Sequence, residues 1–460
     1  MTDVFPKPAA AVRVLHTADW HLGKMLGDLD RADEHQRFLD WLLGELARQQ
    51  VDLLLISGDI FDTANPPQAA ERQYFEFLAG VYRETKCAVI VTGGNHDSPA
   101  HLEAPRRVLH TLNVHITGAL PGNIEDLLVP FPSIDDPQLL VAAVPFLRDR
   151  DLRTGAFGQT ADDIRDELRR GVESVYRRAA DACAGFRKQG AALIAMGHLT
   201  VAGARVSESE RVVHVGGLGK VDHKVFPEDF CYVALGHLHR PQSMGADTIR
   251  YSGSPIPLSF SECEDVKEVR VLDVHHGELI ANHTLPIPAT RYLAQVKVTR
   301  PELEQTLAHL APARGALPSW VEVSVETADA SENLFELVQK LTEHRRDDFE
   351  IVRVQARRER SSGALLSESE DDQFRSVDAL LDDPVEVFER RLEMLTDLSV
   401  SDAAEMRVAF RELYQIHLDS EGGSAAKPLP PEKATESKVV VPEIAEELHF
   451  DFFDAGGEPK

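Results

Sequence analysis

The chain has 460 residues, of which 43% are hydrophobic and 27% charged, as in ordinary soluble globular proteins. This length predicts two or three domains rather than one compact core, and the composition excludes wholesale disorder. The 76 acidic and 49 basic residues give a formal net charge of -27, which argues against tight DNA binding by this chain alone, although bound metal ions would add positive charge that this count omits.

Neither a membrane protein nor a disulfide-stabilised secreted protein is indicated. No apolar run approaches the ~20 residues that a membrane-spanning helix needs, and residues 1–11 lack the profile of a signal peptide. The four cysteines form no CxxC pair and lie far apart, at Cys87, Cys183, Cys231 and Cys263. We therefore expect a cytoplasmic protein with no membrane partner.

The first part of the chain has the pattern of a layered α/β domain, in which short apolar runs alternate with helical stretches. Strands are expected within 12–21, 51–62 and 87–97, with helices between them at 34–49 and 68–82. Further strands are expected within 139–145, 191–198, 231–239 and 248–255, the first two separated by a long helical stretch around 161–186. Residues 267–285 predict a hairpin that turns near Gly277 and closes a domain spanning 1–288.

After Pro286 the pattern changes to three strands alternating with two helices. This predicts a small βαβαβ unit over about 291–358, within a cap domain at 289–360. The unit contains no cluster of metal-ligand residue types, so the sequence leaves open whether it shapes the substrate or only supports the fold. A polar, acidic linker follows at 361–382, and residues 421–460 are expected to form a flexible linker and an acidic tail.

Residues 383–420 predict two amphipathic helices. The first carries apolar residues at helical spacing, including Phe388, and the second begins with a capping box at Asp402 and Glu405 and carries Met406 and Phe410 on one face. Two such helices have no evident core of their own. Either the same chain or a partner helix would cover them, and the spacing fits both interpretations.

Five expected strand ends repeat one design, in which an apolar run stops at a small residue and metal-ligand residue types follow at once. They carry Asp19 and His21; Asp59 and Asp62; Asn95, His96 and Asp97; His198; and His237 and His239. Glycine allows the backbone to turn sharply as it leaves a sheet, and α/β sheets bind ligands at the carboxyl ends of their strands. One such motif alone is weak evidence of a metal site, because an isolated Asp-x-His or Gly-His is more often an ordinary loop. Five such motifs in order on successive expected strands are strong evidence.

The alternation within these motifs indicates how the side chains converge. In an extended segment, side chains two residues apart point to the same face, so Asp19 and His21, or His237 and His239, would reach one metal cluster together. Nitrogen and oxygen ligands without thiolate favour Mn²⁺, Fe²⁺, Zn²⁺ or Mg²⁺. The sequence therefore predicts a divalent metal site.

In this order, the motifs D-x-H, G-D-x-x-D, G-N-H-D, G-H and G-H-x-H resemble the calcineurin-like metallophosphoesterase superfamily. Over about the first 290 residues, segments such as LHTADWHLGK, SGDIFDTANPP and YSGSPIPLSF look like the bacterial nuclease subunits of the SbcD family. The similarity continues more loosely to about residue 418. It implies an α/β fold with a four-layer α-β-β-α sandwich, a small α+β cap domain and C-terminal helices.

The resemblance also implies roles for single residues. Asp19, His21 and His239 would hold one ion, Asn95, His198 and His237 the second, and Asp59 would bridge both. His96 would act as the acid/base residue near the scissile phosphate. Asp62 matches a motif position and is assigned to the catalytic set, although its role as a catalytic or a supporting residue stays open.

The activity and partners implied by the resemblance are those of a DNA nuclease. It would use two divalent ions, with Mn²⁺ expected and Mg²⁺ as the alternative. It would be a homodimer within a heterotetramer that includes an SbcC-type ATPase, and it would degrade double-stranded DNA from 3′ to 5′ and cut single strands and hairpins in repair and recombination. The alternative is a phosphodiesterase acting on a small nucleotide or another phosphoester, because a fold does not dictate its substrate.

Overall fold

The computed structural model describes most of the chain up to residue 358. The described residues are 4–152, 160–207, 210, 220–313, 315–327 and 333–358, with Phe388, Met406, Arg407 and Phe410 beyond them. The chain divides into two units, 1–364 and 365–460. Within the described ranges, no helix has the length and apolar character that a membrane crossing requires.

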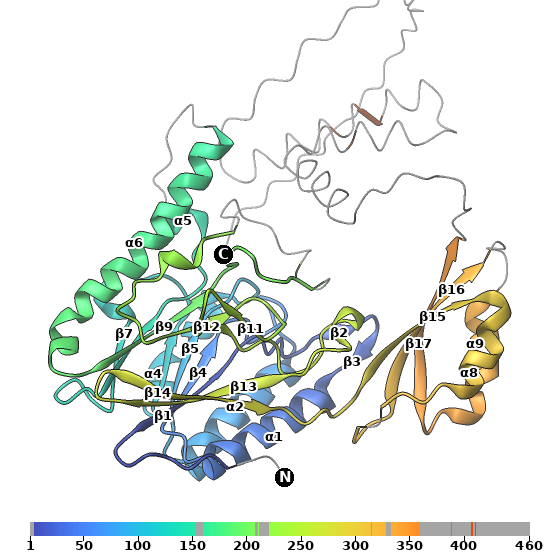
Figure 1. The fold of residues 1–460 in the computed structure, drawn as a ribbon, viewed down its shortest axis with the longest axis horizontal. Coiled ribbons are helices and arrows are strands. Elements are labelled where there is room, and N and C mark those ends of the chain that lie inside the picture. The colour runs from blue at the N-terminus through green and yellow to red at the C-terminus, as the bar shows by residue number, and fades with distance from the viewer. Residues whose placement is uncertain are drawn as a thin grey trace, which may run out of the picture. The chain divides into compact units, whose positions relative to one another are not determined.

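Two six-stranded sheets form the larger part of the first unit (Figure 1). The first sheet has the order β14 (Glu278–Pro286), β13 (Glu268–His275), β1 (Val12–Thr17), β4 (Leu53–Ser57), β5 (Ala88–Thr92) and β6 (Val114–Thr117). The second has the order β11 (Gln242–Met244), β12 (Ala246–Tyr251), β10 (Tyr232–Gly236), β9 (Ala192–His198), β8 (Leu139–Ala143) and β7 (Leu128–Phe131). The central strands of both sheets run parallel, so their carboxyl ends meet at one edge.

The two sheets pack face to face through buried aliphatic side chains, and helices cover their outer faces. Val14 and Leu55 of the first sheet pack with Ile194 and Met196 of the second. The first sheet is covered by α1 (Ala32–Arg48) and α2 (Gln68–Glu84), and the second by α6 (Ala161–Lys188). This confirms the expected four-layer α-β-β-α sandwich.

Each covering helix follows from its sequence pattern. In α1, Phe38, Leu39, Leu42 and Leu46 are buried and recur at helical spacing, so one stripe faces the sheet. The start of α6 is fixed by a capping box, in which Thr160 and Asp163 satisfy each other's backbone N–H groups.

Short elements connect these layers. The helices are α3 (Pro99–Glu103), α4 (Arg106–His110) and α5 (Asp149–Leu152), and a small hairpin joins β2 (Met25–Leu26) to β3 (Leu29–Asp30). Single 3₁₀ turns occur at η1 (Ile124–Leu127), η2 (His223–Val225), η3 (Phe260–Glu262), η4 (Arg300–Glu302) and η5 (Glu343–Arg345).

The sequence did not indicate β6, β7 or β11, which are short strands at the sheet edges, where a strong apolar pattern is not required.

A separate three-stranded sheet, here named the cap sheet, follows the hairpin of β13 and β14. It consists of β15 (Leu293–Thr299), β16 (Ser319–Thr327) and β17 (Phe349–Arg358), all parallel, with α8 (Leu303–His309) and α9 (Leu334–Thr342) packed against it (Figure 1). The expected order of three strands and two helices is therefore present. The domain boundary at residue 288 stays a prediction.

In the second unit, Phe388 and Phe410 stack with ring centroids 4.1 Å apart and planes 6° apart. The sequence predicts that these rings lie on the apolar faces of two different helices. Most of 383–420, the linker 361–382 and the tail 421–460 lie outside the described residues, and the elements expected there stay predictions.

The buried ion pair between Arg13 and Asp273 joins β1 to β13 and generates a stability prediction. Both side chains are 1% exposed and form two charge-assisted bonds of 2.7 Å. Asp273→Ala leaves the guanidinium buried without its counter-charge, so we expect the free energy of unfolding to fall by about 3–5 kcal/mol in urea titrations. The exposed pair of Arg83 and Glu84 provides the control, because Glu84→Ala should cost less than about 1 kcal/mol. Equal effects of the two substitutions would contradict a stabilising role for the buried pair.

Candidate metal centre

The residues expected to bind metal converge where the carboxyl ends of the two sheets meet. Asp19 and His21 follow β1, Asp59 follows β4, and Asn95 follows β5. From the second sheet, His198 ends β9, and His237 and His239 follow β10. The sheets are joined at this point by the hydroxyl of Ser57, which donates to the carbonyl of Ala234 over 3.0 Å.

The backbone at these positions is not extended, so the expected strand alternation was wrong. Asp19, His21 and Asp59 have φ values of 53°, 48° and 49°, and His237 has a φ of 97°. These left-handed conformations follow the ends of β1, β4 and β10, so the side chains converge through tight turns rather than by strand alternation. Left-handed backbone outside glycine is uncommon and gathers at functional sites, where the surrounding fold holds it in place.

Two glycines of the motifs are required for different reasons. Gly58 has a φ of +82°, and a Cβ there would lie 2.1 Å from Nδ1 of His198. Gly94 allows close approach instead, because a Cβ there would lie 2.1 Å from Oδ1 of Asp59. The expected sharp turn is therefore present at Gly58, whereas Gly94 makes room for the carboxylate.

The Asp59 carboxylate lies at the centre of the cluster. Its Oδ2 is 3.2 Å from Nε2 of His198 and 3.5 Å from Nε2 of His21, and its Oδ1 accepts from the backbone of His96 over 2.8 Å. Two groups with metal-ligand spacing share this residue: His21, Asp59 and His96, and Asp19, Asp59 and His198. A carboxylate shared by two such groups has the placement that bridging two cations requires.

The remaining predicted ligands surround these groups. Oδ1 of Asn95 lies 2.9 Å from both Nε2 of His198 and Nδ1 of His237. The His239 ring packs edge-on against the His21 ring, with centroids 5.0 Å apart. The structure therefore brings together all seven predicted metal ligands.

Several histidines are held by Nδ1, which leaves Nε2 directed to the cluster. Nδ1 of His198 donates to the carbonyl of Ser57 over 3.0 Å, and Nδ1 of His96 donates to the carbonyl of Asp62 over 2.7 Å. Nδ1 of His21 lies 3.1 Å from the Asp62 carboxylate, which also accepts from Lys24. An acceptor on one ring nitrogen fixes the tautomer and orientation of a metal-binding imidazole.

The donor atoms fit divalent cations. Oδ2 of Asp19 and Nε2 of His21 are buried and have no hydrogen-bond partner among the residues that the structure describes. Leaving such polar atoms buried and unsatisfied is costly, and a bound cation would satisfy both. The set of carboxylate, imidazole and amide groups matches the ligand preferences of Mn²⁺, Zn²⁺ or Mg²⁺.

Burial and charge shift the pKa values of these groups strongly. Burial raises the pKa of Asp19 well above its usual range. Burial opposes a charged imidazole at His198, but the Asp59 carboxylate outweighs it and raises the pKa of His198 to about 9. Burial also opposes the charge of Asp59, yet the neighbouring His198 and His21 hold its pKa below the usual value. A proton on His198 therefore stabilises the cluster, and a cation that bound this ring would have to displace it.

Three carboxylates near the cluster were not assigned from sequence. Asp97 accepts from the backbone N–H groups of Ile60, Phe61 and Gly94, and burial raises its pKa to about 6. Its place in the Gly93–Asp97 motif was a usable signal. Glu210 and Glu262 both approach His239, and no spacing pattern links them to it in the sequence.

Comparison with known proteins also relates this chain to metal-dependent phosphoesterases. A model described as calcineurin-like phosphoesterase matches residues 12–241, and one described as type 5 capsule protein repressor C-terminal domain matches 289–396. The D subunit of the nuclease SbcCD from Escherichia coli (strain K12) is 33% identical over 405 residues, covering 87% of this chain and 94% of that protein.

Two further relatives carry the same name. The protein of Rhodobacter capsulatus is 41% identical over 313 residues, covering 65% of this chain and 76% of its own length. The protein of Bacillus subtilis is 34% identical over 322 residues, covering 69% of this chain and 80% of its own length. The resemblance inferred from the strand-end motifs is confirmed.

Adding a divalent cation is expected to stabilise the fold, because it satisfies the buried Asp19 and His21 atoms. Mn²⁺ should raise the melting temperature, and the rise should shrink as the pH falls below about 9, because His198 becomes protonated there and the proton competes with the metal. Asp59→Asn should abolish most of the rise, whereas Asp126→Asn, on the exposed η1 turn, should preserve it. A Mn²⁺ response that Asp59→Asn leaves intact would place the metal elsewhere.

Proposed function

This chain belongs to the family of SbcCD nuclease D subunits, within the calcineurin-like phosphoesterases, and from this premise we propose that it is a metal-dependent DNA nuclease. Membership of the phosphoesterase family implies divalent metal ions and hydrolysis of phosphoesters. The observation that carries the proposal is the shared position of Asp59 between two groups with metal-ligand spacing.

We assign the metal ligands as the family resemblance implied. Asp59 would bridge two ions; Asp19, His21 and His239 would complete one site, and Asn95, His198 and His237 the other. The short distances from Asn95 to His198 and His237 support the second set, and Asp59 lies close to a histidine of each set. Asp19 also lies within metal-ligand spacing of His198, so its assignment to the first set rests on the family resemblance. Mn²⁺ is the proposed ion and Mg²⁺ the alternative.

His96 is the proposed acid/base residue. When bound, two divalent ions supply Lewis-acid charge, which polarises a phosphate and lowers the pKa of a water molecule. His96 is partly exposed beside the cluster, its ring packs edge-on against that of His21, and its Nδ1 is held by the carbonyl of Asp62. Nε2 is then the nitrogen from which a proton would pass to the leaving 3′ oxygen.

Asp62 acts as a positioning residue in this proposal, because its polar atoms contact two histidines. Its carboxylate lies against His21 and accepts from Lys24, while its carbonyl accepts from His96. The His21 and Lys24 contacts hold the pKa of Asp62 at about 2, against the opposing effect of burial, so it stays ionised at neutral pH and is a poor proton donor.

Asp62→Asn is expected to weaken metal binding about ten- to a hundredfold, because it removes the charged acceptor that orients His21. The carbonyl that holds His96 remains, so turnover at saturating metal should recover. Mn²⁺ titration by calorimetry, with turnover measured across metal concentrations, separates the two effects. Turnover that stays lost at saturating metal would instead assign Asp62 a catalytic role.

DNA is the proposed substrate, and the net charge of -27 indicates that a partner contributes to holding it. The relatives are named as subunits of SbcCD, which supports an SbcC-type ATPase as that partner. We propose that residues 383–420, which include Phe388 and Phe410, form the segment that binds it. We also propose a homodimer within a heterotetramer, with Phe75 and Tyr82, which are exposed seven residues apart on α2, as candidate contacts between copies. The proposed location is the bacterial cytoplasm, where such DNA lies.

The nuclease proposal is tested with end-labelled linear duplex DNA and Mn²⁺, with and without the ATPase partner and ATP. We expect 3′ to 5′ loss of nucleotides that EDTA abolishes and the partner strengthens, together with cleavage of single strands and hairpins. His96→Ala should keep both metal ions and lose most turnover, about 10²–10⁴-fold, as removal of an acid/base group does. Asp59→Ala should lose metal and turnover together.

His110→Ala, on the exposed surface of α4, is the matched control and should cleave normally. Full activity of His96→Ala would reject its assignment. Metal-dependent hydrolysis of bis-p-nitrophenyl phosphate without cleavage of any DNA would support the metal site. It would indicate that the substrate is a small nucleotide or another phosphodiester instead of DNA.

A further inference from the structure

His239 is contacted by a buried carboxylate that the proposed hydrolysis does not use. Oε1 of Glu262 lies 3.3 Å from Nδ1 of His239, and Glu262 is fully buried. An acceptor at Nδ1 is also what Ser57 gives to His198 and Asp62 gives to His21. His239 therefore has an orienting group of its own.

Glu262 is itself fixed in place by several donors. Its Oε2 accepts from Nζ of Lys267 over 2.7 Å and from the backbone N–H of Leu258 over 3.1 Å. Lys267 is also buried, and the same ammonium donates to the carbonyl of His239 over 2.9 Å. One ion pair thus holds both the ring and the backbone of His239.

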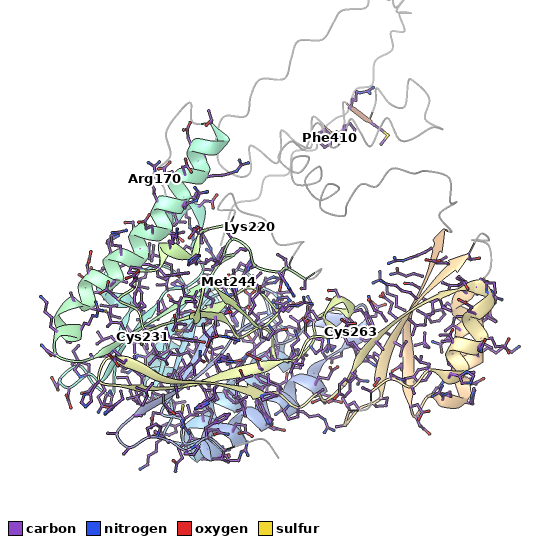
Figure 2. All side chains as sticks on the ribbon, in the orientation of Figure 1. Arg170, Lys220, Cys231, Met244, Cys263 and Phe410 are labelled. Carbon is purple, nitrogen blue, oxygen red and sulfur yellow. The ribbon has the colours of Figure 1, made fainter. Side chains whose placement is uncertain are left out.

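The turn that carries Glu262 also contacts the cap sheet. Phe260, at the start of η3, packs with Leu293 of β15 and Trp320 of β16 in a small buried cluster, against which Cys263 also packs. Figure 2 labels Cys263 at this junction. The guanidinium of Arg291 lies 4.0 Å from the centre of the Trp320 ring and bonds to Glu34 of α1, which fixes the cap sheet against the larger domain.

We propose that Glu262 is a positioning residue for His239, and that the cap sheet steadies Glu262 through Phe260. The inference rests on the proposed metal site. This inference gives the cap sheet a chemical role. The cap sheet contacts Phe260 of the η3 turn, and Glu262, two residues further along the same turn, orients the metal ligand.

Glu210 is the other carboxylate near His239, with Oε1 3.6 Å from Nδ1. It also accepts from the backbone N–H groups of His239 and Ser207. Glu262 is closer to the ring nitrogen and is ion-paired to Lys267, so it presents a fixed anionic acceptor. For these reasons the orienting role is assigned to Glu262.

The test is Mn²⁺ binding to the full chain by calorimetry. Glu262→Gln should weaken one of the two binding events about ten- to a hundredfold and leave the other unchanged, as loss of an orienting partner does. Glu264→Gln, two residues along and exposed, is the matched control and should bind as the parent does. If Glu262→Gln does not fold, judged by circular dichroism, Glu262→Asp, which shortens the reach to His239, replaces it.

The cap contact is tested with Trp320→Leu, which removes the ring against Phe260, beside Phe335→Leu on the exposed face of α9. Trp320→Leu should weaken the same binding event as Glu262→Gln, and Phe335→Leu should weaken neither. Unchanged binding in Glu262→Gln overturns the positioning role, and unchanged binding in Trp320→Leu overturns the role of the cap sheet. If the unsubstituted protein binds no Mn²⁺, the proposed metal site itself is overturned. This outcome is recognised without the variants, so it is distinct from failure of the positioning role.

Discussion

The structure depends on keeping the carboxylate of Asp59 charged in a buried position between two sheets. An isolated buried carboxylate is strongly unfavourable, and it is tolerated only where charges and hydrogen bonds compensate. Here protonated His198 supplies the opposing charge, and the backbone of His96 supplies a donor. These groups come from strands of both sheets, so the site exists only when the sheets are packed together.

The need to hold Asp59 in this position explains why strained backbone in the turns occurs beside tightly packed strands. Asp19, His21 and Asp59 adopt left-handed backbone, which costs of the order of 1–3 kcal/mol each. The strands behind them are fully buried and pack through aliphatic side chains, which resist relaxation of the turns. Asp97 adds a direct restraint, because its carboxylate accepts from three backbone N–H groups in the loops after β4 and β5. The fold thus supplies a preorganised set of donors, in which a bound cation would replace the proton that His198 otherwise holds.

The sequence predicted the layers, the strands of the sheet centres and the residues of the cluster, because each leaves a local signal. Apolar runs that end in Gly-Asp or Gly-His are visible without any tertiary information. The turn conformation was predicted wrongly, since the spacing Asp19-x-His21 fits both an extended segment and two left-handed residues. Glu262 left no signal at all: its relation to His239 arises only when the segment after β12 folds back over the loop after β10. Supporting contacts of this kind depend on tertiary packing, which residue spacing does not encode.

Under the proposed function, the distribution of charge separates chemistry from substrate capture. A surface with a net charge of -27 gains little from counterion release at DNA phosphates, which is the main source of affinity in autonomous DNA-binding proteins. The local positive charge belongs to the metal centre, where it acts on one phosphate at a time. Holding a duplex therefore depends on surfaces that this chain does not supply alone. On this proposal, a nuclease arranged in this way would cleave more efficiently when a partner brings DNA to the site.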